Sequence, residues 1–293
     1  MPLPHFEYVA ARTVEEALDL WRERSLCAYF AGGTDLLPQM RLGRRALARI
    51  IDIKRISGLD QIRETDAGLV IGAAVPLAEI EAHPAVRADF PLLAQCVRVV
   101  GARPLRNRAT LVGNICNASP AADTAVALLV LDGLVRTVRE DGPRELSVIE
   151  FFTGPGRTVL RPGELVTEVV LPRGRVWHGS YLRLSRRRGM DLATVGVLVA
   201  SSNHTAGRRY RIALCAVAPV PMRVLQAEAL LEAEGVAGAG RAADVARATD
   251  IAEAAAIARA SCSPITDLRG TAEYRRDMVG VLVARGATAL ARA

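Results

Sequence analysis

Two segments of the chain have compositions that suit ligand binding better than ordinary packing. The first is Ala-Gly-Gly-Thr-Asp at positions 31–35, directly after an apolar run. Glycines lack a Cβ atom and can adopt positive φ, so their successive N–H groups can form a concave nest for phosphate oxygens. A plain strand-to-helix turn would explain the same glycine pair. This segment alone therefore leaves both readings open.

The second segment, residues 110–123, combines two asparagines, hydroxyl groups, one glycine and one carboxylate. Such a set offers hydrogen-bond donors and acceptors in both senses, as a sugar–phosphate chain requires. A turn with capping residues is the alternative. Because residues 110–120 are mostly small and polar, we expect them to form a loop. The stretch between the two segments is long enough to form a separate lobe. Their combination therefore favours a single ligand that both segments bind.

The elements around the first segment predict a small α/β lobe at residues 1–57. Thr13 and Glu16 have the spacing of a capping box, which predicts a helix start. Apolar residues at helical spacing follow, and strands are predicted at Cys27–Phe30 and 50–53.

The rest of the chain predicts two further domains, which gives an α+β fold overall. Residues 58–175 form the second lobe, with a hairpin near 59–74, a helix after Pro91 and a buried helix after Asp123. Residues 176–293 form the third. Its strands are expected at 181–185, 193–202 and 211–217, and its helices near 222–234, 242–260 and 271–292.

Composition excludes several classes of function. The net charge is +7, but the basic residues are spread along the chain and Lys54 is the single lysine, so no nucleic-acid partner is expected. The five cysteines include no CxxC pair and the four histidines are scattered, so no metal site is expected. No apolar run reaches 18 residues, and residues 1–7 have neither the basic start nor the apolar stretch typical of a secretory signal. We expect a soluble, cytoplasmic protein without a membrane span.

In matching order, the segments 31–36 and 110–123 resemble the FAD-binding (medium) subunit of molybdenum hydroxylases of the xanthine dehydrogenase and carbon monoxide dehydrogenase type. The resemblance continues at 163–172 and 181–193, so it spans nearly the whole chain. It implies a two-lobed FAD-binding domain of the PCMH type. A C-terminal domain with a three-stranded antiparallel sheet and a helical bundle would follow.

The resemblance also implies which residues hold FAD. The two glycine-bearing loops would grip its diphosphate from opposite lobes, an acid would touch the cofactor, and an apolar residue would lie close to the flavin. The implied residues are Tyr29, Phe30, Ala31, Gly32, Gly33, Thr34, Asp35, Leu36, Val100, Thr110, Gly113, Asn114, Asp123, Val166 and Leu182.

Two positions depart from the family pattern. Val112 stands where the family has a first glycine, and Leu182 stands where some relatives have lysine. If the missing glycine had positive φ, valine would be strained there by roughly 1–3 kcal/mol. We therefore expect Val112 to weaken FAD binding or shift the loop. The run Arg186–Arg188 lies either beside the flavin or a subunit seam, or in a solvated turn.

The function implied by the resemblance is electron transfer within a heteromeric complex. A small subunit would carry [2Fe-2S] clusters and a large subunit the molybdenum cofactor. The FAD here would pass electrons to NAD+, quinone or oxygen. The chain would need no catalytic acid or base of its own. Two alternatives are a free-standing FAD-dependent oxidase and a flavin-free assembly protein.

Overall fold

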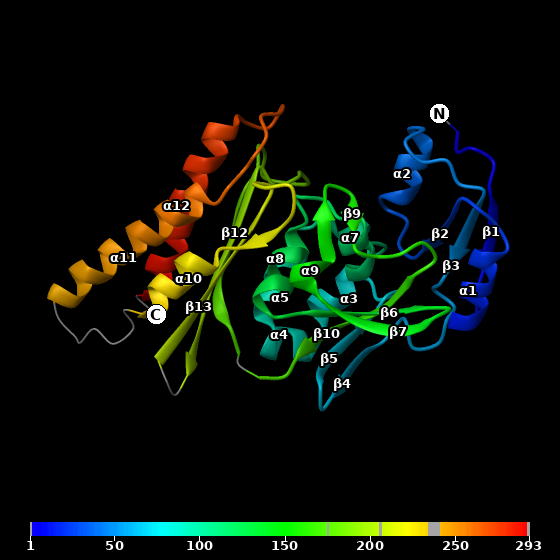
Figure 1. The fold of residues 1–293 in the computed structure, drawn as a ribbon, viewed down its shortest axis with the longest axis horizontal. Helices are drawn as coiled ribbons and strands as arrows, with labels where there is room; N and C mark the ends of the chain where they lie inside the picture. The colour runs from blue at the N-terminus through cyan, green and yellow to red at the C-terminus, as the bar shows by residue number, and fades with distance from the viewer. Residues whose placement is uncertain (1, 175, 205–206, 234–240, 292–293) are drawn as a thin grey trace.

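The computed structural model describes residues 2–174, 176–204, 207–233 and 241–291. A small N-terminal lobe lies at one end of the molecule (Figure 1). Three helices lie at the other end: α10 (Leu225–Ala233), α11 (Arg241–Ala260) and α12 (Ala272–Ala291). Two larger sheets and most of the short helices fill the space between them.

The N-terminal lobe contains three parallel strands in the order β1–β3–β2. Helices α1 (Val14–Arg22) and α2 (Leu36–Arg41) form the connections that parallel pairing requires. The strands are β1 (Glu7–Ala10), β2 (Cys27–Phe30) and β3 (Arg49–Asp52). The predicted strand at 27–30 and the strand–helix–strand order are therefore confirmed.

The predicted capping box begins α1. The Glu16 N–H donates to Thr13 Oγ1 at 3.1 Å, and Glu16 Oε2 accepts from the Arg12 N–H at 2.7 Å. The return bond thus reaches Arg12 rather than Thr13. Both bonds satisfy amide groups close to the helix start.

The second sheet has five antiparallel strands in the order β4–β5–β10–β6–β7. The predicted hairpin is confirmed as β4 and β5. The strands are β4 (Ile62–Thr65), β5 (Gly68–Gly72), β6 (Leu134–Arg139), β7 (Gly142–Ser147) and β10 (Leu165–Pro172). Between them run α3 (Leu77–Ala82), α4 (Pro84–Asp89), α5 (Pro91–Arg98), α6 (Arg103–Arg106), α7 (Leu111–Cys116), α8 (Asp123–Val130), α9 (Val148–Phe151), β8 (Phe152–Gly154) and β9 (Arg157–Thr158).

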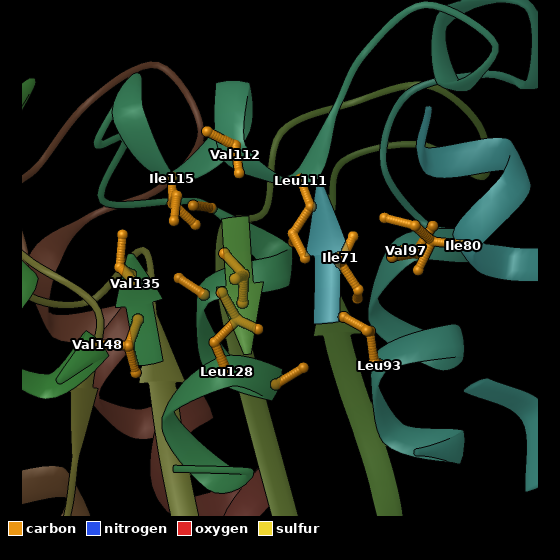
Figure 2. Packing of buried hydrophobic residues seen from close by; sticks show 14 of the residues in the cluster. Ile71, Ile80, Leu93, Val97, Leu111, Val112, Ile115, Leu128, Val135 and Val148 are labelled. Carbon is orange, nitrogen blue, oxygen red and sulfur yellow. The ribbon is translucent and has the colours of Figure 1, made fainter. Parts of the chain in front are cut away.

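Helix α7 corrects the expectation of a loop at residues 110–120. Thr110 caps this helix, because its Oγ1 accepts the Gly113 N–H at 2.9 Å. Leu111, Val112 and Ile115 are buried with the main core cluster, as Figure 2 shows. Three apolar residues at near-helical spacing are enough to anchor one short helix despite the polar residues between them.

The third sheet is antiparallel, with strands β11 (His178–Leu184), β12 (Val195–His204), β13 (Gly207–Cys215) and β14 (Met222–Arg223). It therefore has four strands in the described part, not three. The helix expected near 222–234 begins at Leu225 because Met222 and Arg223 pair with β13.

The two faces of the third sheet pack against different cores. Val195, Val197 and Val199 of β12 join a cluster with α10–α12, whereas Leu198 and Ala200 join the cluster that contains α5 and α8. Alternation along a strand produces this division. The sheet thus lies between the C-terminal helices and the second lobe (Figure 1).

Candidate FAD-binding site

The first glycine loop connects β2 to α2, and both glycines have a steric reason to be there. Gly33 has φ +72°, and a Cβ at this position would lie 2.2 Å from the Phe30 ring. A Cβ on Gly32 would lie 2.1 Å from the carbonyl oxygen of Arg108, in the second lobe. Gly32 therefore allows the two lobes to approach each other.

The loop presents a row of unused hydrogen-bond donors. Among the described residues, no acceptor takes the N–H groups of Gly32, Gly33, Thr34 or Asp35. Asp35 occupies the N-cap position of α2, but its side chain makes no capping bond. Four consecutive free amides at a positive-φ turn form an arrangement that binds anions.

Lys54 holds this loop in place through contacts with Ala31 and Phe30. Its Nζ donates to the Ala31 carbonyl at 3.2 Å, pairs with Asp52 Oδ2 at 2.7 Å and lies 4.3 Å from the centre of the Phe30 ring. The Tyr8 hydroxyl also donates to Asp52. Burial raises the pKa of Asp52, but these hydrogen bonds outweigh burial and hold the pKa below its usual value.

The second segment faces the first across a cavity of about 140 Å³. Thr110, Gly113 and Asn114 line it together with the whole predicted first loop. Gln39 of α2 donates to Asn117 Oδ1 at 2.9 Å, which connects the lobes at this point. The lining residues are Tyr29, Phe30, Ala31, Gly32, Gly33, Thr34, Asp35, Leu36, Gln39, Arg45, Ala109, Thr110, Gly113, Asn114, Cys116 and Asn117.

A second, more apolar cavity of about 430 Å³ adjoins the first and shares five lining residues with it. Val166 lines this second cavity. Trp21 and Tyr29 pack with ring centres 4.9 Å apart, and the Tyr29 hydroxyl donates to the Gly163 carbonyl at 2.9 Å. Burial raises the pKa of Tyr29 above its ordinary value, so this hydroxyl remains a neutral donor. The shared residues are Tyr29, Ala31, Arg45, Gly113 and Cys116.

Arg45 was missed by the sequence analysis. It lies on an exposed stretch after α2, lines both cavities, and makes no ion pair with any described residue. An unpaired guanidinium beside free amides adds a charged, potentially bidentate donor for phosphate. No motif marks this residue, so only its spatial position could reveal it.

Asp123, Val100 and Leu182 line neither cavity. Asp123 begins α8 and is buried, while Val100 packs at the edge of the main core. Tyr181 and Arg183 of β11 both donate to Asp123 Oδ1, and Leu182 between them lies on the opposite side of the strand. It packs with the C-terminal helices, close to Gly286. The structure therefore does not bring the Leu182 side chain to the cavities.

The strained-valine hypothesis is also corrected. Val112 lies inside α7 and does not have positive φ, so the condition for strain is not met. The residue is 5% exposed and packs into the core beside the second cavity. The run Arg186–Arg188 forms an exposed turn, in which Arg187 Nε donates to the Met190 carbonyl at 2.9 Å.

The donors, shape and charge of the paired cavities fit FAD. The free amides and Arg45 suit a diphosphate, and the apolar second cavity suits a ring system. Gly113 lines both cavities, and apart from its own helix backbone and chain neighbours, Thr110 Oγ1 at 3.0 Å is the single described atom within 4 Å of its added Cβ. Its missing side chain thus leaves open space that a ligand can use.

Comparison with known proteins agrees with this geometry. Residues 4–174 match the family model described as the FAD binding domain in molybdopterin dehydrogenase. Residues 180–290 match the CO dehydrogenase flavoprotein C-terminal domain. The chain belongs to this family of FAD-binding oxidoreductase subunits.

Individual relatives match over almost their full length. The carbon monoxide dehydrogenase medium chain of Hydrogenophaga pseudoflava is 34% identical, with 98% of this chain and 97% of the relative covered. The nicotine 6-hydroxylase medium subunit of Paenarthrobacter nicotinovorans is 31% identical, with 97% of each covered. A solved structure of the Hydrogenophaga pseudoflava carbon monoxide dehydrogenase superposes with a TM-score of 0.88 at 33% identity, covering 98% of this chain and 97% of that one.

Two further searches concern other kinds of site. In the described ranges, no group of three histidine, cysteine or acidic side chains is placed to hold a metal ion. Within the same part of the chain, no helix combines the length and apolar character needed to cross a membrane.

Proposed function

We propose that the chain holds FAD between lobes 1–57 and 58–175, and that domain 176–293 packs against the second lobe. The three larger sheets, one in each of these parts, and the two family matches, which meet between residues 174 and 180, support these boundaries. The single observation that carries the proposal is the row of free amides at Gly32–Asp35 facing Gly113 across a cavity.

Each part of the predicted site has a role in this proposal. The amides of the first loop and Arg45 would bind the diphosphate, while Thr110 and Asn114 would contact the adjoining sugar–phosphate chain. The second cavity, with Val166 and Tyr29, would enclose an apolar ring. Leu182 would contribute through its backbone at most, because its side chain packs on α12.

The chain would act as the electron-transfer subunit of a heteromeric molybdenum hydroxylase in the cytoplasm. A flavin supplies chemistry that accepts and releases electrons singly or in pairs. This would allow coupling between [2Fe-2S] clusters of a small subunit and NAD+, quinone or oxygen. A molybdopterin large subunit would hydroxylate the substrate. The names of the relatives, which are medium chains and subunits, support this division.

Titration of the purified, cofactor-stripped chain with FAD tests the proposal. We expect saturable binding of one FAD per chain, measured by the change in flavin absorbance. Binding far weaker than that of its relatives, or none, would favour the flavin-free assembly protein. Co-purification with iron- and molybdenum-containing chains separates the subunit from a free-standing oxidase, which would reduce oxygen with its own substrate in their absence.

A further inference from the structure

Two segments of the C-terminal domain lie side by side and form one surface, which we call the tip patch. The patch comprises residues 186–192, in the turn between β11 and β12, and residues 265–274, between α11 and the first turn of α12. Arg186 Nη1 donates to the Leu268 carbonyl at 3.4 Å, which joins the two segments. Figure 1 shows the connection between α11 and α12 beside the end of β12.

Exposed apolar side chains are concentrated on the tip patch. Leu268 is 95% exposed and Ile265 is 70% exposed. Of the eleven large apolar residues that are exposed in the described chain, five belong to the patch: Met190, Leu192, Ile265, Leu268 and Tyr274. Single exposed apolar residues are normal in soluble proteins, but a contiguous group of them marks an interaction site.

A buried arginine holds the patch in place. Arg275 of α12 is 3% exposed and donates to the carbonyls of Thr194 at 2.8 Å and Ala216 at 3.0 Å. It also pairs with Asp267, which accepts a second bond from Arg269. Both segments are therefore fixed to the third sheet before any partner binds, and a preformed surface loses little conformational entropy on binding.

Several polar atoms at the patch have no hydrogen-bond partner. In the described structure five buried side-chain nitrogen or oxygen atoms are unpartnered, and four of them lie in the patch or directly beneath it. They are Asp191 Oδ2, Thr194 Oγ1, Arg269 Nε and Arg275 Nε. Folded proteins leave few such atoms, so their concentration here fits a surface that another molecule completes.

The exposed charge of the tip patch is mainly positive. The run Arg186–Arg188 is exposed, and its last two members form no ion pair with a described residue. The side chains of Asp191 and Asp267 are 6% and 25% exposed and lie beside arginines, whereas Glu273 is exposed. Protein interfaces are enriched in aromatic residues, methionine and arginine. The patch therefore suits a protein surface that presents carboxylates around an apolar site.

A second copy of this chain is a poor occupant of the patch. The chain has a net charge of +7, and two tip patches in contact would bring their own arginine runs together. A nucleic acid is also disfavoured, because the most exposed members of the patch are apolar whereas phosphate contacts need a basic surface. An acidic protein surface satisfies both the apolar and the charged members.

We propose that the tip patch docks an acidic surface of a partner subunit. Leu268 enters an apolar pocket of that surface, and the run Arg186–Arg188 pairs with carboxylates around it. This inference rests on the proposed function, in which the chain works inside a heteromeric complex. It concerns a separate surface, because no residue of the patch lines either cavity.

The test measures binding of the purified chain to the iron- and molybdenum-containing subunits that co-purify with it. Leu268→Asp should raise the dissociation constant about tenfold or more, because it replaces an apolar anchor by a charge of the partner's own sign. Leu26→Asp is the matched control. Leu26 is 64% exposed in the first lobe and has φ +57°, where aspartate is tolerated, so binding should change by less than about twofold.

A charge reversal tests the electrostatic part of the proposal. Arg187→Glu should weaken binding mainly by slowing association, and its difference from the wild type should shrink as salt is added. Arg44→Glu, in the exposed stretch after α2, should leave association with the partner subunits unchanged to within about twofold. Thermal unfolding and FAD titration establish that each variant of the patch is folded.

Three outcomes would overturn the inference. The first is wild-type partner binding in Leu268→Asp, and the second is an equal loss in Leu26→Asp. The third is self-association of the wild-type chain that Leu268→Asp abolishes, which would make a second copy the occupant. Failure of the wild-type chain to bind any iron- or molybdenum-containing subunit would instead overturn the proposed function.

Discussion

The backbone of Gly32 lies against the carbonyl oxygen of Arg108, with no room for even a methyl group between them. An added Cβ would be 2.1 Å from that oxygen, and Arg108 belongs to the other lobe. The three nearest atoms are all backbone, so the clash could not be relieved by rotating a side chain. The separation of the lobes, and with it the width of the first cavity, depends on this glycine.

Gly32→Ala is accordingly expected to push the lobes apart. Overpacking of this kind costs about 1–3 kcal/mol of stability. FAD affinity should fall as well, because the amides of the first loop would move away from Gly113. Thermal unfolding and FAD titration measure the two effects. Gly154→Ala is the matched control, since its added Cβ would have nothing nearer than Arg157 at 4.0 Å; equal behaviour of the two variants would contradict the prediction.

Gly113→Ala should separate binding from stability. Gly113 is inside α7, where alanine is favoured over glycine by up to about 1 kcal/mol. Apart from its own helix backbone and chain neighbours, Thr110 Oγ1 at 3.0 Å is the one described atom close to the added Cβ, so the unliganded protein should keep its stability to within about 1 kcal/mol. The new methyl group would lie in the wall that Gly113 contributes to both cavities, and would reduce the space for FAD there and weaken its binding. A variant that binds FAD as tightly as the wild type would show that the ligand does not approach this helix.

Val112→Gly is expected to destabilise the protein without tightening FAD binding. Glycine in a helix costs about 1 kcal/mol, and loss of a buried valine side chain adds about 1.5 kcal/mol or more. Val112 has helical backbone geometry and is buried, so a glycine would relieve no strain. Urea denaturation and FAD titration check both parts. Tighter binding in the variant would restore the original strain hypothesis.

Arg45→Gln should reduce FAD affinity about tenfold, the effect of losing one charge-assisted hydrogen bond. Arg44→Gln supplies the control, because Arg44 is adjacent and exposed but lines neither cavity. Titration in increasing salt adds a second measurement. The difference between the wild type and Arg45→Gln should shrink as salt screens the charge.

The Asp52 cluster should make the protein more sensitive to acid. The pKa of Asp52 is below its ordinary value of 3.8, so its contribution to stability is fully present above that value. As the pH falls through the lower, folded-state pKa, Asp52 becomes protonated and this contribution is lost. The free energy of unfolding of the wild type should therefore decrease more steeply below pH 3.8 than that of Asp52→Asn. Parallel pH profiles from urea denaturation would contradict this.

Much of the fold could be predicted because local signals agreed with tertiary structure. The Thr13–Glu16 capping box and the short strand at 27–30 needed no distant partner to be recognised. Helix α7 was missed because Thr110 caps it and the core buries it, and neither fact shows in its polar composition. The boundary between β14 and α10 depends on pairing with β13, which local propensity does not contain.

The candidate site, too, was predictable from the sequence only in part. Sequence patterns indicated the two loops, and the structure brings them to one cavity. Alternation along β11 predicts that Tyr181 and Arg183 share a face, but not which face meets α8. The resemblance indicates Leu182 as a site residue, whereas the side chains that contact Asp123 are those of its neighbours, Tyr181 and Arg183. Arg45 has no motif around it, so its place at the cavities follows only from the path of the chain in space.

The lone lysine gives this molecule an unusual chemical property. Apart from the α-amino group, Lys54 carries the only primary amine in the chain, and its side chain is 30% exposed. Acylation there would abolish the cation that pairs with Asp52, supports the Ala31 carbonyl and lies over Phe30. Among side chains, an amine-reactive reagent would thus label Lys54 alone. The rate of labelling would report on how firmly Lys54 is held against the first glycine loop.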